Sequence, residues 1–119
     1  MDIFPVISRC LIVVKPKQPL VDWINKLDPT NPVTLEEAQY DTSSYLLPTF
    51  DEILDPERTV ESYLKSNYQG IFLQELSDWY LDPKAYPKMT YSHFLEWFEI
   101  STHSMVFDMV NGPITKYNL

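Results

Sequence analysis

The stretch VISRCLIVVK, residues 6–15, decides the fold that the sequence predicts. It is rich in β-branched residues and stops at Pro16, which is typical of a β-strand. Apolar side chains occupy both alternating faces, with Val6, Cys10, Ile12 and Val14 on one and Ile7, Leu11 and Val13 on the other. A strand that is apolar on both faces is usually central in its sheet. We therefore expect neighbours on both sides and at least partial cover on both faces.

Helical patterns begin directly after this strand. Pro19 suits a first helical turn, and apolar residues at helical spacing predict a short amphipathic helix over 19–27. Thr34 and Glu37 then form a capping-box pattern that starts one or two further turns. The chain therefore leaves the first strand through helices before it can form a second strand.

A long helix is predicted in the middle of the chain. Asp55 and Pro56 are a favourable N-cap pair, and an apolar stripe continues to about Leu81. The stripe fits one long helix or two helices broken near Gly70. A compact helix then follows Thr90 and is expected to bury three side chains, namely Phe94, Leu95 and either Phe98 or Trp97.

Two further strands complete the pattern. Residues 43–48 predict a short strand that Pro48 ends or places at an edge. Residues 99–110 predict a last strand, which Asn111-Gly112-Pro113 breaks. This order predicts an α+β fold, with a small, mostly antiparallel sheet of about three strands and helices packed chiefly on one face. The length of 119 residues predicts a single domain over residues 1–119.

The charge of the chain limits its partners. Seventeen acidic residues against nine basic ones give a net charge of −8. This balance disfavours nucleic acid and anionic membranes, since both are bound through clustered Lys and Arg. A basic partner protein is compatible with the charge, and so is simple solubility.

The compartment follows from what the sequence lacks. One cysteine, Cys10, forms no internal disulfide, which favours a reducing compartment. The N-terminal apolar run has no basic start and is interrupted by Arg9, so it does not match a signal peptide. No apolar stretch is long enough to span a membrane. We expect a cytoplasmic location by default.

Four stretches carry a resemblance, namely VVKPKQPLVDWI, YLLPTFD, WYLDPKAYPK and FLEWFEISTHSMVFDM. With these the chain resembles a family of short, acidic bacterial proteins with no assigned activity. The most specific part is PKQPLVDW, in which two prolines flank Lys-Gln beside an Asp-Trp pair. The resemblance implies a bacterial, single-domain protein and assigns no role to any residue.

His103 and Arg9 are polar residues within apolar strands. Strand alternation places His103 on a face with Ser101, Met105, Phe107 and Met109, and that face is expected to be buried. His103 is then either a hydrogen-bonded core residue, which base rates favour, or a general base or binding group. If the first and last strands are neighbours, Arg9 and His103 lie on one face and form a polar pair for a ligand. Alternatively, Arg9 lies on the open, solvated face of the sheet, and this placement is favoured over the polar pair.

Catalytic and metal-binding patterns are weak. A nucleophilic pair of Cys10 and His103 is disfavoured, because a buried free cysteine behaves as a small hydrophobic residue. His93 and His103 fall in different elements without metal-ligand spacing, so we expect no metal and no cofactor. The residues favour a non-enzymatic protein over an enzyme.

Aromatic residues exceed what a small core hides. Trp79, Tyr80 and Tyr86, beside prolines in WYLDPKAYP, are candidates for an exposed binding rim or for covering helix ends. Two function hypotheses follow. The first is an accessory protein that binds another protein through an acidic, aromatic-rimmed surface. The second is a small-molecule binder or enzyme with a pocket near Arg9 and His103, while self-association through a sheet edge is a third possibility.

Overall fold

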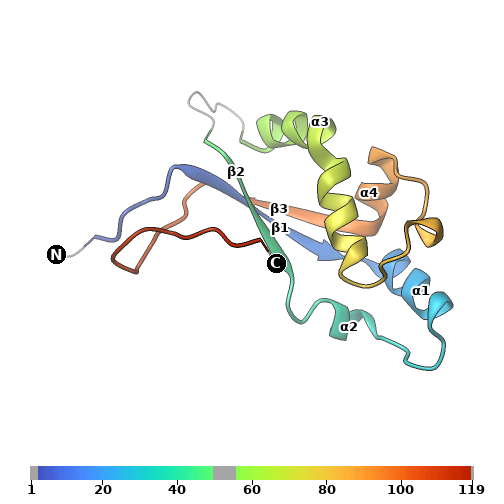
Figure 1. Ribbon diagram of the computed structural model, residues 1–119. Helices are drawn as coiled ribbons and strands as arrows, with labels where there is room; N and C mark the ends of the chain where they lie inside the picture. The colour runs from blue at the N-terminus through green and yellow to red at the C-terminus, as the bar shows by residue number, and fades with distance from the viewer. Residues whose placement is uncertain (1–2, 50–55, 119) are drawn as a thin grey trace.

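A three-stranded antiparallel sheet forms the centre of the molecule (Figure 1). The computed structural model describes residues 3–49 and 56–118, with side chains from residue 59 in the second segment. The strands are β1 (Arg9–Pro16), β2 (Ser43–Pro48) and β3 (Phe98–His103). They lie in the order β2-β1-β3, so the first strand is central, as its apolar faces predicted.

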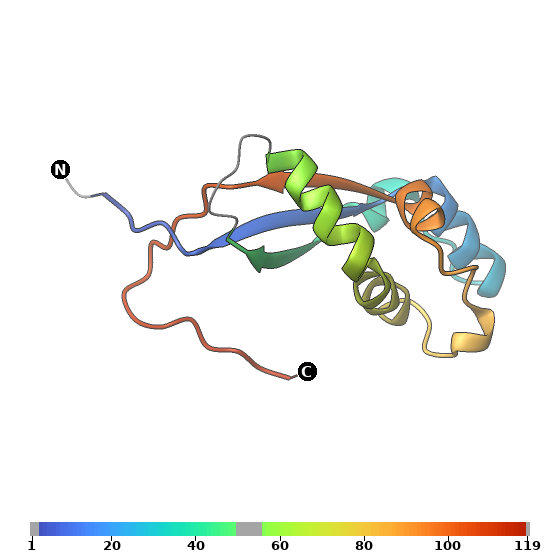
Figure 2. The same ribbon diagram turned by 90° about the horizontal axis from the view of Figure 1, so that it is seen from above.

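Helices cover one face of this sheet and continue beyond one of its ends. They are α1 (Gln18–Leu27), α2 (Leu35–Ala38), α3 (Pro56–Ser77), the 3-10 turn η1 (Pro83–Ala85) and α4 (Tyr91–Trp97). Figures 1 and 2 show α3 and α4 on the same side of the sheet, with α1 and α2 beyond one end of it. The predicted α+β class is confirmed. No helix in the described part of the chain is long and apolar enough to cross a membrane.

The helix starts follow their local sequence. In α2 the backbone N–H of Glu37 donates to Thr34 Oγ1 over 3.1 Å, and the N–H of Thr34 donates back to Glu37 Oε1 over 3.2 Å. This is the predicted capping box. In α4 the hydroxyl oxygen of Thr90 accepts from the N–H of His93 over 3.1 Å. Each cap satisfies an N–H group that has no partner within the helix.

Helix α3 begins at Pro56, as predicted, while the N-cap expected at Asp55 lies outside the described residues. The helix runs through Gly70 without a break and changes direction along its length (Figure 2). It ends at Ser77 and not near Leu81, because the N–H groups of Trp79 and Tyr80 both bond to the carbonyl of Leu76. That turn closes the helix four residues early and exposes the aromatic segment behind it.

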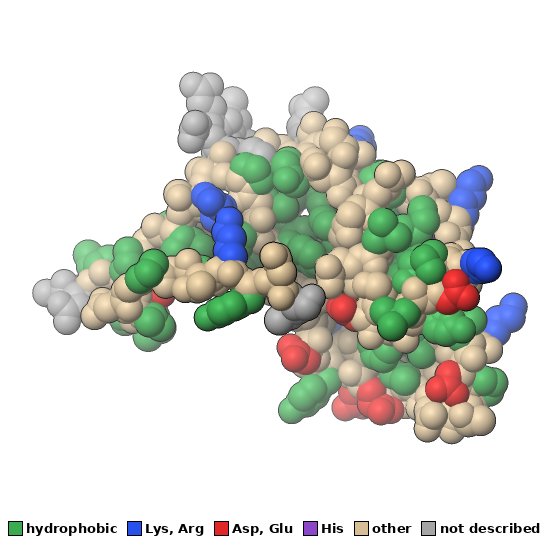
Figure 3. Space-filling view, viewed as in Figure 1, with side chains coloured by type: hydrophobic (Ala, Val, Ile, Leu, Met, Phe, Trp, Pro, Cys, Tyr) green, Lys and Arg blue, Asp and Glu red, His purple; other side chains and the backbone are tan. Residues whose placement is uncertain are grey.

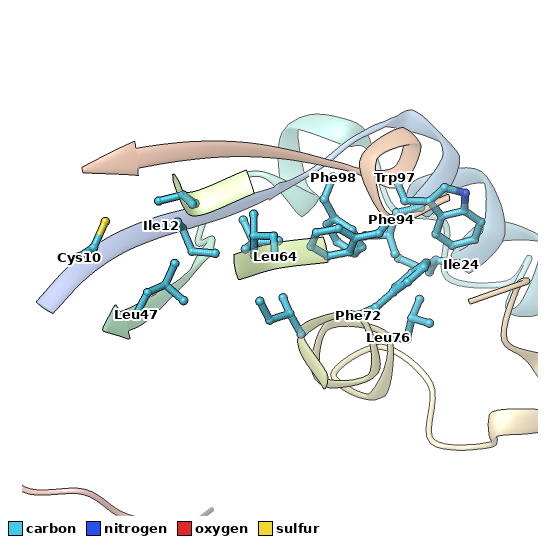
Figure 4. Packing of buried hydrophobic residues seen from close by; sticks show 14 residues of the cluster. Cys10, Ile12, Ile24, Leu47, Leu64, Phe72, Leu76, Phe94, Trp97 and Phe98 are labelled. Atoms are coloured by element: carbon cyan, nitrogen blue, oxygen red, sulfur yellow. The ribbon is translucent and has the colours of Figure 1, made fainter. Parts of the chain in front are cut away.

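The core lies between the sheet and the helices (Figure 4). Its three largest fully buried side chains are Phe72, Phe94 and Phe98, from α3, α4 and β3. Their ring centroids lie 5.5–5.7 Å apart. Each buried ring stabilises the fold by about 1.5–3 kcal/mol relative to an exposed one. The prediction for α4 was wrong at Leu95, which stays 40% exposed because the helix turns Phe94 and Trp97 inward.

The second face of the sheet is open. Leu11 of β1 lies opposite Leu46 of β2 and His103 of β3, and all three side chains share this face. His103 is exposed, so the expected burial of its face was wrong. The other expected members of that face, Ser101, Met105, Phe107 and Met109, are exposed as well. The physical reason is that the helices cover only the opposite face, which carries Cys10, Ile12 and Val14.

Strand β3 ends at His103 and not at Val110 as predicted. His103 lies opposite Leu11 and Phe107 lies opposite Val6, so the N-terminal segment has one extra residue between these two pairs. Such a shift interrupts the ladder of backbone hydrogen bonds. Beyond it, the N–H of Ile7 donates to the carbonyl of Val106 over 2.8 Å and keeps the two segments together.

Candidate functional site

A hollow of about 440 Å³ lies where the sequence predicted an exposed aromatic rim. Its volume falls within the range of about 300–1,000 Å³ that is usual for binding pockets. Trp79 and Tyr80 line it, together with Trp23 of α1. The remaining lining residues are Ile24, Leu27, Asp28, Asn31 and Val33. We call this site the aromatic hollow. It joins the end of α1 and the loop after it to the segment behind α3.

The wall of the aromatic hollow is held by Trp23. Its indole Nε1 donates to the carbonyl of Ala85 over 2.8 Å. Its ring packs edge-on against Tyr80 and Tyr86, at centroid distances of 6.4 and 6.0 Å. The hydroxyl of Tyr86 donates to the carbonyl of Tyr80 over 2.6 Å. Tyr86 therefore supports the hollow from behind, while Trp79 and Tyr80 line it.

Asp28 places a carboxylate in the aromatic hollow. Thr30 Oγ1 donates to one of its oxygens over 2.7 Å, and Asn31 Nδ2 donates to the other over 3.3 Å. These hydrogen bonds lower the pKa of Asp28, so the group is charged at neutral pH. Aromatic faces beside a carboxylate are suited to a cationic or apolar side chain. The amide of Asn25 holds the nearby loop, because it bonds both the N–H and the carbonyl of Val33.

Arg9 and His103 share the open face of the sheet on neighbouring strands, as the sequence predicted for adjacent first and last strands. Both are exposed, which places Arg9 on the solvated face of the sheet. Arg9 Nη1 donates to the carbonyl of Ser8 over 2.7 Å. His103 Nε2 lies 3.1 Å from Ser101 Oγ. Neither side chain reaches the aromatic hollow.

Cys10 lies on the covered face and His103 on the open one, so their side chains point to opposite sides of the sheet. The thiol donates weakly to the backbone carbonyl of His103, over 3.6 Å, and not to its ring. Burial raises the pKa of Cys10, which keeps the thiol protonated at neutral pH. The arrangement provides no activated nucleophile at this position.

A buried carboxyl group, Glu75 of α3, was missed at the level of sequence. It is only 6% exposed, and it accepts a hydrogen bond of 2.5 Å from the hydroxyl of Tyr45 on β2. Burial raises the pKa of Glu75. The signal for its burial was its place beside Phe72 and Leu76 on the apolar stripe of α3.

The surroundings of Glu75 include Asp41 and Asp78, which line a hollow of about 160 Å³ with it. Within the described residues, no three His, Cys, Asp or Glu side chains are grouped closely enough to hold a metal ion. The bond to Tyr45 accounts for the buried carboxyl as a link between sheet and helix.

Comparison of the chain with family models, with curated proteins and with solved structures gives no match.

Proposed function

We propose that the protein is a non-enzymatic interaction domain that binds a partner protein through the aromatic hollow. The observation that supports this is the exposure of Trp79 and Tyr80, each of which leaves 39% of its surface open beside the fixed ring of Trp23. Trp and Tyr in preformed hollows are the residues that most often dominate the energy of protein interfaces. A partner side chain that enters the hollow removes this apolar surface from water.

Charge indicates the chemistry of the partner. The chain carries a net charge of −8, and Figure 3 shows acidic side chains gathered near α2 and the loop that precedes it. Asp28 adds a carboxylate within the aromatic hollow itself. A Lys or Arg side chain of the partner contacts both the aromatic faces and this carboxylate when it enters the aromatic hollow. The proposed partner therefore presents a basic residue at the centre of its contact surface.

The test compares two variants with the native chain in an affinity pull-down analysed by mass spectrometry. Trp79→Ala removes an exposed ring of the aromatic hollow, and Leu73→Ala removes an exposed apolar side chain of α3 as a matched control. Circular dichroism establishes that both variants are folded. We expect one partner that the native chain and the control retain and that Trp79→Ala loses.

Calorimetry with that purified partner then measures direct binding. We expect Trp79→Ala to weaken the affinity by about tenfold or more, which is typical of a central aromatic residue. Asp28→Asn is expected to weaken binding and to reduce its dependence on salt, since one attraction between charges is lost. A partner with the same affinity for the native chain and for Trp79→Ala contradicts the proposal.

The second candidate function is binding of a small molecule near Arg9 and His103. Their common place on the open face of neighbouring strands supports it. The exposure of both side chains suits a shallow site for an anion. NMR titration of the His103 ring with phosphate or citrate tests this function. Ring signals of the native chain that stay unchanged when the anion is added contradict it.

A further inference from the structure

Among the residues that the structure describes, the outer edge of β3 carries backbone groups without a hydrogen-bond partner. The N–H of Lys17 donates to the carbonyl of Trp97 over 2.8 Å, which sets the hydrogen-bond phase between β1 and β3. In an antiparallel pair the residues that bond across the ladder alternate with residues that face away. Ile100 and Thr102 therefore direct their N–H and C=O groups away from β1. Within the described residues, no hydrogen bond reaches these outward groups.

A hollow of about 520 Å³ lies beside this edge. Val60 and Leu64 of α3 form its buried floor, and Tyr91 and Leu95 of α4 stand at its rim. The side chain of Ile100 faces it from β3. We call it the edge hollow. Figure 2 shows the first turns of α3 and the whole of α4 on the same side of β3.

The two edges of the sheet differ. The same hydrogen-bond phase directs the backbone of Ser44, Leu46 and Pro48 outward on β2. Pro48 has no N–H group, so it blunts that edge against a further strand. Strand β3 contains no proline, and its outward residues Ile100 and Thr102 are β-branched and suited to strand pairing. The hollow beside β3, of about 520 Å³, is also larger than the one of about 160 Å³ that Ser43 of β2 lines.

We propose that the edge of β3 accepts an extended segment of a partner protein as a fourth strand of the sheet, with an apolar side chain of that segment in the edge hollow. The free backbone groups of Ile100 and Thr102 select an extended main chain. The floor of Val60 and Leu64 selects an apolar residue, while alternate residues of the segment remain in solvent. The negative charge of the chain favours basic residues at those solvent positions. This surface is separate from the aromatic hollow.

The probe is the peptide acetyl-Lys-Val-Lys-Leu-Lys-Val-Lys-amide, titrated into the labelled full chain and followed by NMR. Two control peptides have the same sequence and charge. One carries N-methyl groups on its apolar residues, and the other carries them on its internal lysines. In a strand, N–H groups of alternate residues point to opposite edges, so one methylated set blocks pairing with β3 and the other does not.

We expect the unmethylated peptide to bind and to shift the amide signals of Ile100 and Thr102. One methylated peptide is expected to lose about tenfold in affinity while the other stays within about twofold, which is the effect of one or two backbone hydrogen bonds. The set that blocks binding also shows whether the segment runs antiparallel or parallel to β3. Equal binding of both methylated peptides, or no binding of the parent peptide, overturns the proposal.

Variants of the chain test the same edge. Thr102→Pro removes an outward N–H of β3, and Ser44→Pro removes an outward N–H of β2 as the matched control. We expect only Thr102→Pro to weaken the peptide, by about tenfold. Leu95→Ser is expected to weaken it through the edge hollow, with Leu73→Ser as its control. Unchanged affinity in Thr102→Pro overturns the proposal.

The strand addition and the aromatic hollow are tested independently. Trp79→Ala is expected to bind the peptide as the native chain does, so the failure of one proposal leaves the other standing. Sedimentation of the chain without peptide tests whether a second copy of the chain occupies the edge of β3. A native dimer that Thr102→Pro converts to a monomer, while Ser44→Pro does not, assigns the edge to self-pairing and overturns the partner segment.

Discussion

Replacement of Tyr45 by Phe tests the buried hydrogen bond that joins β2 to α3. The change keeps the aromatic ring and removes only the hydroxyl that donates to Glu75 over 2.5 Å. A hydrogen bond to a charged group contributes about 1.5–3 kcal/mol, and one between neutral groups about 1 kcal/mol. We therefore expect Tyr45→Phe to lower the free energy of unfolding by about 1.5–3 kcal/mol where Glu75 is ionised, and by about 1 kcal/mol where it is protonated.

The sign of the pH dependence follows from Glu75. Burial raises its pKa above 4.5, and the bond from Tyr45 opposes that rise. The folded chain therefore keeps the proton to a higher pH than the unfolded chain. The stability gained in this way is complete below 4.5 and is lost as the pH rises through the folded pKa. Without the hydroxyl, the pKa of Glu75 in the folded chain rises further. The free energy of unfolding of Tyr45→Phe therefore falls by about 0.5–2 kcal/mol more than that of the native chain over this pH range.

Urea unfolding of the native chain and of Tyr45→Phe measures the difference in their free energies of unfolding. Measurements at about pH 4 and at about pH 8 span the range in which a buried Glu titrates. Tyr40→Phe is the matched control, because Tyr40 is almost fully exposed. We expect the control to match the native chain at both values. A cost of Tyr45→Phe that is the same at both pH values, or below about 0.5 kcal/mol at both, refutes the reasoning.

Two further predictions concern the core and the wall of the aromatic hollow. Phe72→Ala is expected to lower the free energy of unfolding by about 3–5 kcal/mol, because it leaves a cavity among buried rings, whereas its exposed neighbour Leu73→Ala costs far less. Urea unfolding compares the two, and equal costs contradict the inward orientation of Phe72. Trp23→Phe removes the 2.8 Å bond to Ala85 and is expected to cost about 1 kcal/mol. Amide exchange over residues 79–86 is expected to rise in this variant, and unchanged exchange there contradicts the role of the bond.

Local sequence predicted much of the fold. The apolar faces of residues 6–15 predicted a central strand, and the capping residues Thr34 and Thr90 marked two helix starts correctly. These features depend on neighbours in the chain, which the sequence shows directly. The last strand was predicted to end at Val110 and the long helix at Leu81, and both ends were placed too late. The strand is cut short by a register shift and the helix by a closing turn, and both depend on partners outside the local pattern.

The candidate site was predicted only in part. Trp79 and Tyr80 were identified as a rim, and the structure places them in a hollow. The contribution of Trp23 was missed, since its bond to Ala85 joins residues that are 62 positions apart. Glu75 was missed because its partner Tyr45 lies on a strand 30 positions away.

The sequence by itself determined the elements, the central position of β1 and the negative charge, because periodicity, capping and composition are properties of the chain alone. Only the tertiary structure decided which face of the sheet the helices cover. Both faces of β1 are apolar, so alternation alone could not choose between them. That choice exposed His103, buried Cys10, and placed α3 and α4 beside the outer edge of β3. Its physical reason is that α3 and α4 bring two of the largest fully buried side chains, Phe72 and Phe94, to one side of the sheet.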